Sequence, residues 1–199
     1  MRFRLLSTLV LVASGAAIIA SCATGDSPTS PPAVAPPAAP SQSLLGGLLG
    51  TPQKVVGLQR TTPLASPITV SKNIGLLGGT LSIPQAGLTV IVPPLALTST
   101  KKVSITALAG STVAYEFSPA GTKFLLPLVA TQSLVNTQAH NGGLINPLSL
   151  FVGYFADNSN INLISEILNI NLNLLGQLAI FDIWHFSGYI LASGYDGGL

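Results

Sequence analysis

The segment Thr80-Leu81-Ser82-Ile83-Pro84-Gln85-Ala86-Gly87-Leu88-Thr89-Val90-Ile91-Val92 decides the fold class of this chain. Apolar and hydroxyl side chains alternate on both sides of the Pro84–Gly87 stretch, and a period of two is that of a half-buried β-strand. Proline and glycine between the two runs are typical of a turn. The segment therefore predicts two short strands separated by a turn.

Further runs of the same kind lie on either side of this segment. Ile68–Lys72 and Lys102–Leu108 alternate in the same way, and Val113, Tyr115 and Phe117 point to one face of another run. Short β-branched and aromatic runs, broken by Gly or Pro about every 8–12 residues, are the pattern of a β-sandwich. We therefore expect an all-β fold built as an antiparallel β-sandwich.

The asparagine-rich segment 161–175 fits two periods. Its apolar residues also accept helical spacing, but its later asparagines alternate strictly with Ile and Leu, and asparagine ranks low among helix formers. We expect strands over 161–167 and 168–175. We place the folded domain at residues 61–199, because this length suffices for one sandwich core and is too short for two domains.

The N-terminus has the layout of a bacterial lipoprotein signal. Arg2 and Arg4 precede an apolar run from Leu5 to Ala20, and Cys22, the only cysteine, follows. The run falls short of the ~20 apolar residues that a membrane span needs. An ordinary secretory signal would leave a lone thiol in an oxidising compartment. We therefore predict that the signal peptide, residues 1–21, is removed and that Cys22 is lipidated and anchors the chain in a membrane.

The predicted location is the cell envelope. Ala23, not aspartate, follows the cysteine, which resembles lipoproteins that two-membrane bacteria forward to the outer membrane. Residues 22–60 are predicted to be a lipid-anchored linker. Its Pro/Ala-rich part, 26–43, favours extended polyproline II and is a semi-rigid spacer of about 3.1 Å per residue. Leu44–Gly50 is apolar but too rich in glycine for a stable helix, and either docks on the domain or rests near the lipid.

The composition argues against nucleic acid binding. Without Arg2 and Arg4, the eight basic residues become six, which equals the number of acidic residues. Nucleic acid binding depends on many phosphate contacts, and a chain of zero net charge without a basic patch does not supply them. Only 7% of the residues are charged, against about 25% in ordinary soluble domains. A surface with so few charges suits an extracytoplasmic protein that presents an apolar binding surface to a partner.

Three motifs resemble one family when they are taken in order. They are Gly78–Ile83 with Gly87–Pro94 and Ala96-Leu97, then Tyr115–Phe124 with Pro127, then His185–Tyr189. Together they resemble the ZU-five domain, a β-sandwich of ankyrins, zonula occludens proteins and netrin receptors, over residues 74–192. The resemblance implies a ZU-like interaction module. The family usually has glycine where Leu95 stands; if that glycine supports a positive φ, leucine must strain or reroute the turn.

The third motif also carries the clearest candidate chemistry. In some eukaryotic relatives, a Phe-Ser bond in this context cuts itself. By position, the resemblance implies that Ser187 is the nucleophile, that Phe186–Ser187 is the scissile bond and that His185 transfers the proton. In the alternative interpretation, Phe186 is a core residue, and His185 and Ser187 face outward on the last strand.

Other enzymatic readings find little support in the sequence. A hydrolytic triad would have to combine His140 or His185 with Asp157, Asp182 or Asp196, and no nucleophile elbow surrounds any serine. No set of metal ligands and no phosphate-binding or dinucleotide-binding motif is present, so we predict neither a metal nor a cofactor. A sugar- or peptide-binding surface would use the aromatic residues Tyr154, Trp184, Tyr189 and Tyr195.

The sequence thus favours a non-enzymatic envelope lipoprotein whose ZU-like β-sandwich binds a protein or surface partner. Two alternatives stay open at this point. One is a self-processing domain that is cut at Phe186–Ser187. The other is a passive structural lipoprotein of the envelope.

Overall fold

The computed structural model describes residues 52–140 and 143–196. Cys22, the predicted signal peptide and most of the predicted linker lie outside the described residues. Three short 3-10 helices, η1 (Pro84–Ala86), η2 (Pro147–Ser149) and η3 (Asn158–Asn160), interrupt the strands. The strands are β1 (Gln53–Gly57), β2 (Gln59–Leu64), β3 (Ile68–Ile74), β4 (Gly79–Ile83), β5 (Leu88–Val92), β6 (Lys101–Ala107), β7 (Gly110–Thr112), β8 (Ala114–Ser118), β9 (Lys123–Ser133), β10 (Phe151–Phe155), β11 (Leu163–Ile164), β12 (Glu166–Leu168), β13 (Ile170–Asn173), β14 (Leu178–His185) and β15 (Gly188–Tyr195).

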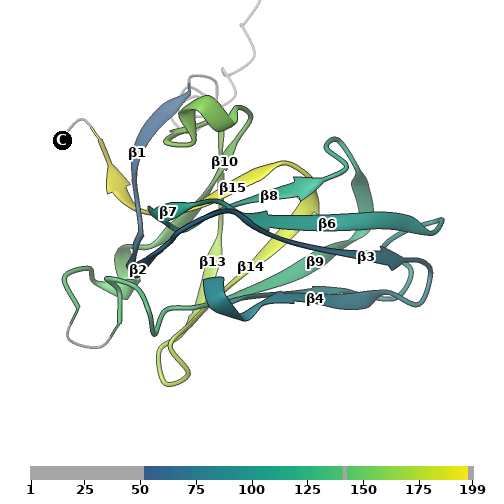
Figure 1. The fold of residues 1–199 in the computed structure, drawn as a ribbon, viewed down its shortest axis with the longest axis horizontal. Coiled ribbons are helices and arrows are strands. Elements are labelled where there is room, and N and C mark those ends of the chain that lie inside the picture. The colour runs from purple at the N-terminus through teal and green to yellow at the C-terminus, as the bar shows by residue number, and fades with distance from the viewer. Residues whose placement is uncertain (1–51, 141–142, 197–199) are drawn as a thin grey trace, which may run out of the picture. The chain divides into compact units, whose positions relative to one another are not determined.

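These strands form two main antiparallel sheets, so the predicted all-β sandwich is confirmed (Figure 1). The larger sheet has the order β11-β1-β15-β8-β6-β3, and β10 and β12 extend it from β15. The smaller sheet has the order β13-β14-β9-β5-β4, and β2 pairs with β7 in a separate ribbon. Residues 80–92 form most of the β4–β5 pair, with the 3-10 turn η1 between the two strands.

The main hydrophobic core lies where the inward side chains of both sheets meet. Leu81 and Val90 come from the smaller sheet, and Ile105, Tyr115 and Phe117 come from the larger one. All five are buried, as the period of two requires. A second, smaller core contains Val55, Ala114, Phe155, Ile164, Ile190 and Ala192. The larger sheet is therefore covered on both faces near β15.

The asparagine-rich segment is built from strands, as the alternation predicts. β11 and β12 lie in the larger sheet, and β13 pairs with β14 in the smaller sheet. In β13, Ile170 and Leu172 are half-buried, whereas Asn171 and Asn173 are exposed. The chain thus crosses from one sheet to the other between Leu168 and Ile170.

The predicted boundary between linker and domain at residue 61 is wrong. β1 pairs with the last strand, β15, with Val55 opposite Tyr195 and Val56 opposite Gly194. Val55 and Leu58 are buried, so residues 53–60 contribute to both cores. The short run escaped the sequence analysis because its pairing partner lies at the other end of the chain.

Candidate functional site

The predicted triplet His185-Phe186-Ser187 connects β14 to β15, and its three side chains go to three different places. Phe186 is buried, with its ring 4.7 Å from that of Phe124 and 5.6 Å from that of Phe117. Its amide donates a hydrogen bond to the Thr122 carbonyl at 2.8 Å. Its own carbonyl accepts one from the Gly121 amide at 3.0 Å. Phe186 therefore fixes the end of β14 to the turn before β9.

The His185 ring faces an acidic and aromatic surrounding. Its Nε2 lies 3.4 Å from Glu166 Oε2, and its Nδ1 lies 3.5 Å from the Tyr189 hydroxyl. The same hydroxyl donates a hydrogen bond to the His185 carbonyl at 2.6 Å. Burial raises the pKa of Tyr189 above its usual range, and the charge of Glu166 adds to the rise. Tyr189 therefore keeps its proton and acts as a donor.

Ser187 is directed away from this histidine. Its Oγ donates to the Phe155 carbonyl at 3.4 Å. No hydrogen bond joins Ser187 to His185 in the part of the chain that the structure describes. The structure therefore does not bring together the nucleophile and the proton carrier that the ZU-five resemblance implies, although Gly121 gives the Phe186 carbonyl a backbone donor of the kind an oxyanion needs.

A shallow groove of about 260 Å³ lies beside His185, where the chain crosses from β12 to β13. Trp184, half exposed at 53%, and Asp182 reach it from the outward face of β14. Its remaining polar residues include Glu166, Asn169 and Asn171. Two carboxylates and two amides around an indole can hydrogen-bond a polar ligand while the ring covers an apolar face.

The four aromatic residues of the predicted sugar- or peptide-binding surface are split by the fold. Trp184 and Tyr189 both line the groove, although Tyr189 is buried. Tyr154 packs edge-on against the His185 ring at 5.1 Å, and Tyr195 stacks on Phe151 at 5.2 Å. The structure therefore leaves one exposed aromatic residue, Trp184, at this groove.

The remaining candidates for a triad are engaged separately. His140 contacts Gln177 through its Nδ1. Asp157 accepts two hydrogen bonds from Ser159, which lower the pKa of its carboxyl. Asp196 pairs with Lys54 at 2.5 Å. Among residues 52–140 and 143–196, no three metal-ligating side chains of His, Cys, Asp or Glu gather at one place.

A second candidate site is an exposed apolar surface at the end of β4 that is remote from η1. There the loops β3–β4 and β5–β6 meet the start of β9 (right side of Figure 1). We call it the leucine surface, and its residues are Leu76, Leu77, Leu95 and Leu125. Leu77 is 91% exposed and the other three are more than half exposed. Leu95 donates a backbone hydrogen bond to Leu76 at 2.8 Å, and Leu125 donates one to Ala96 at 3.0 Å. These bonds hold the three segments together.

Leu95 stands where the ZU-five resemblance implies glycine, and its backbone has a left-handed conformation, with a φ of 66°. A left-handed conformation costs an L-residue other than glycine roughly 1–2 kcal/mol. Its side chain is 60% exposed, so packing offsets little of this cost. Of the two outcomes expected for leucine here, strain is the one that the structure has.

Exposed lysines lie on the strands that adjoin the leucine surface. Lys101 and Lys102 begin β6 next to the end of β3, and Lys123 begins β9. The ammonium group of Lys72 lies 3.5 Å from the Thr80 carbonyl at the start of β4. Neither the loops that form this surface nor the start of β9 contain an acidic residue. The surface is therefore apolar at its centre and positive around it.

Sequence reasoning missed two residues that the structure makes prominent. Glu166, the partner of His185, lies 19 positions before it and has no local motif. Arg60 fell inside the predicted linker, although one signal was available: it is the only arginine after Arg4.

Comparison with known proteins adds no family. A scan against protein-family models finds no match, and a search of curated proteins finds none. The resemblance to the ZU-five domain therefore stays a prediction from three motifs. Within the described residues, no helix has the length and apolar character needed to cross a membrane.

Proposed function

We propose that this chain is a non-enzymatic, lipid-anchored module of the cell envelope that binds a protein partner through the leucine surface. The predicted lipidation at Cys22 and the predicted spacer support the anchoring. The spacer also favours a partner at some distance from the lipid, because an extended proline-rich segment holds the domain away from the bilayer.

The observation that carries this proposal is the state of Leu95. Its backbone is strained and its side chain is mostly in water, so the residue costs stability in two ways. Leu76, Leu77 and Leu125 expose further apolar area beside it. Strain that stability does not explain is typical of a site that serves binding.

The surroundings of the leucine surface indicate the chemistry of the partner. Burial of the four leucines would drive association, because it removes exposed apolar surface from contact with water. The lysines around them favour a partner with acidic residues at the rim of its own apolar patch, since complementary charges guide the encounter and exclude other partners.

Site-specific photo-crosslinking in the producing cells tests this proposal. A photo-crosslinking amino acid at Leu77 should give one protein adduct of discrete mass, and an additional Leu125→Ser substitution should abolish it. The same amino acid at Leu175, a fully exposed leucine outside the leucine surface, serves as the matched control and should give no such adduct.

The other outcomes would each replace the proposal. An adduct of twice the chain's mass would make the leucine surface a contact between copies of this chain. A lipid adduct would make it a membrane-docking face. No adduct at Leu77 beyond that at Leu175 would favour the passive structural lipoprotein.

Self-cleavage at Phe186–Ser187 is a second candidate, and the hydrogen bond from the Gly121 amide to the Phe186 carbonyl favours it. That donor would stabilise the oxyanion when Ser187 Oγ attacks the Phe186 carbonyl carbon. The Phe186–Ser187 C–N bond would then break, the Ser187 amine would take up the proton, and water would hydrolyse the resulting ester. His185 would have to turn from Glu166 toward Ser187 to accept the proton.

A further inference from the structure

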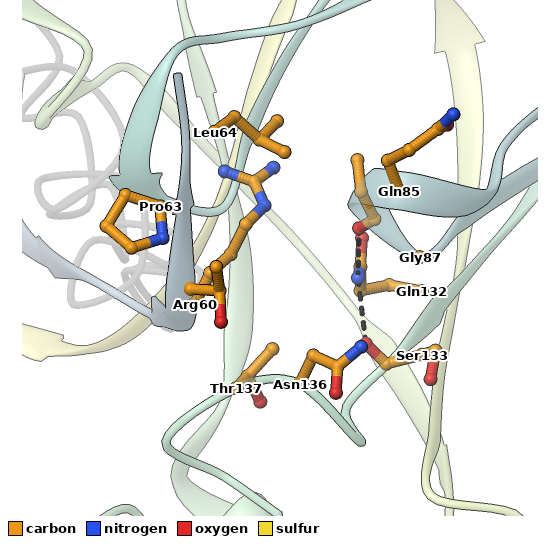
Figure 2. Close-up of a pocket in the computed structure, with 11 residues that line it drawn as sticks. Arg60, Pro63, Leu64, Gln85, Gly87, Gln132, Ser133, Asn136 and Thr137 are labelled. Carbon is orange, nitrogen blue, oxygen red and sulfur yellow. Dashed lines mark hydrogen bonds between the residues drawn. The ribbon is translucent and has the colours of Figure 1, made fainter. Parts of the chain in front are cut away.

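A cavity of about 310 Å³ lies at the other side of the sandwich from the leucine surface, between β2, the η1 turn and the end of β9 (Figure 2). The guanidinium of Arg60 stands on one wall, across the open space from Gln85 and Gln132. Ser133, Asn136 and Thr137 line the lower part in this view. No acidic residue is among the lining residues that the structure describes.

Arg60 is a buried cation whose charge is not compensated. It is only 6% exposed, and an arginine side chain stays protonated at any ordinary pH. The salt bridges among the described residues join Lys54 to Asp196 and His185 to Glu166, so none involves Arg60. A buried charge without a counter-charge is costly, and proteins keep one where it has a use.

The orientation of the guanidinium is fixed by its neighbours. Its Nη1 donates to the Thr112 carbonyl, and its central carbon lies 5.6 Å from the centre of the Tyr115 ring. The backbone of Arg60 forms a β-bridge with Thr137. The side chain is therefore held in place before any ligand arrives, which lowers the entropy that binding must cost.

The two remaining guanidinium nitrogens of Arg60, Nε and Nη2, are available to bind a ligand. Nε and Nη2 of Arg60 are both buried, and neither has a hydrogen-bond partner within residues 52–140 and 143–196. These two N–H groups lie on the same edge of the planar guanidinium and form one fork. Such a fork matches the two oxygens of a carboxylate in a bidentate, charge-assisted pair.

We infer that this cavity binds a small carboxylate that carries neighbouring hydroxyl groups. The carboxylate pairs with the Arg60 fork, and the amides of Gln85 and Asn136 with the hydroxyl of Ser133 bind the polar remainder of the ligand. The volume is at the small end of the range of ligand pockets, about 300–1,000 Å³. A ligand of this chemistry is either a free hydroxy acid or a uronic acid unit of a glycan. The site does not depend on the leucine surface.

Nuclear magnetic resonance on the full chain tests this inference directly. The Nε–H signal of Arg60 is identified by its loss in Arg60→Lys, and it is followed together with the amide signals of Gly87 and Ser133. Addition of D-glucuronate or L-lactate should shift all three signals in a saturable manner. D-glucose, which lacks the carboxylate, should leave the Arg60 signal unchanged.

The two acids distinguish the sources of the ligand. Stronger binding of glucuronate indicates a uronic acid unit, and stronger binding of lactate indicates a short hydroxy acid. If neither acid shifts the Arg60 signal, the inference is wrong. Tighter binding of inorganic phosphate than of both acids would also overturn it, because a tetrahedral anion would then be the better partner of the site.

Substitutions provide the second arm of the test. Arg60→Lys keeps the charge but removes the fork, so the affinity for the better acid should fall at least tenfold. Gln85→Ala and Asn136→Ala change exposed side chains on the cavity wall and should weaken binding severalfold in a folded protein. Lys72→Gln removes a cation outside the cavity and should leave the affinity unchanged. Equal affinities of the parent and the two wall variants would contradict the proposed site.

Discussion

Leu95 donates its backbone N–H to the carbonyl oxygen of Leu76 at 2.8 Å, and so joins the loop before β6 to the loop before β4. The bond forms while Leu95 has a φ of 66°. The loop thus has a backbone conformation that favours glycine, and Leu95 adopts this left-handed conformation.

This relationship predicts an unusual order of stability for two variants of Leu95. Leu95→Gly should be more stable than Leu95→Ala by about 0.5–1 kcal/mol, because only glycine relieves the left-handed strain and this relief exceeds glycine's entropic cost. Urea denaturation followed by circular dichroism measures the difference. The usual order, with alanine the more stable residue, would show that the backbone here is not strained.

Gly188 is predicted to be a position where a single methyl group is not tolerated. A Cβ atom at Gly188 would overlap the ring of Phe155, which is fully buried and cannot move aside. Gly188→Ala should therefore lower the free energy of unfolding by about 2–3 kcal/mol. Gly194→Ala lies in the same strand, where a Cβ would meet open space, and should stay within about 0.5 kcal/mol of the parent. Similar losses in both variants would contradict the packing described for Phe155.

The burial of the Tyr115 hydroxyl predicts a loss of stability at high pH. Burial raises its pKa from 10.0 to about 12, and the charge of Arg60 offsets part of that rise. Because the pKa of the folded state is the higher one, the stabilisation by the neutral phenol is complete below pH 10 and is lost as the pH rises toward 12. The parent should therefore lose on the order of 2–3 kcal/mol more than Tyr115→Phe over this interval.

The matching measurement is urea denaturation of the two proteins at neutral pH and across this alkaline interval. At neutral pH, Tyr115→Phe should be the less stable by about 1–2 kcal/mol, since it removes the buried hydroxyl that hydrogen-bonds the Ala86 carbonyl at 2.9 Å and Gln132 Oε1. The gap should close and then reverse as the pH rises toward 12. A gap that stays constant would mean that Tyr115 ionises as readily in the folded chain as in the unfolded one.

The lipid anchor is predicted from the sequence and is tested by mass. Protein extracted from membranes with a C-terminal tag should have the mass of Cys22–Leu199 plus its acyl chains. Cys22→Ser should remove both the acyl mass and the membrane association, because the thiol is the acylation site. An unmodified mass beginning near Ala20 would instead indicate an ordinary secretory signal.

The same mass measurement decides on self-cleavage. If Phe186–Ser187 is cut, denatured protein should yield a tagged fragment that begins at Ser187, and Ser187→Ala should yield a single uncut chain. Glu166→Gln should then change the rate of cutting, since Glu166 is the neighbour of the His185 ring. A single uncut chain in both the parent and Ser187→Ala would remove this candidate.

Most of the fold could be predicted from local alternation, and the exceptions have a common cause. The runs around Pro84–Gly87 and in 168–175 carry their signal within a few residues, and both form strands as expected. β1 has no such signal: its five residues become a strand because β15 pairs with them. Contacts between the ends of a chain are not visible in a short window of sequence.

The candidate sites divide in the same way. Leu95 was recognisable because it stands where the predicted ZU-five resemblance implies glycine. The partners Glu166 and His185 meet only through the crossing of the chain between the two sheets. The role proposed for Arg60 depends on Thr112 and Tyr115, which follow it by more than 50 residues and hold its guanidinium at the cavity wall. Such relations are properties of the topology.

The pairing of β1 with β15 also determines how the domain responds to mechanical force. Tension from the N-terminal side enters the domain at Gln53 and loads β1 first. β1 is held by hydrogen bonds to β11 on one side and to β15 on the other, and the Lys54–Asp196 pair closes its outer end. A pull must therefore break the pairing of β1 with both neighbouring strands before it reaches the main core. β1, which falls inside the predicted linker, is thus the first element of the domain to bear the load.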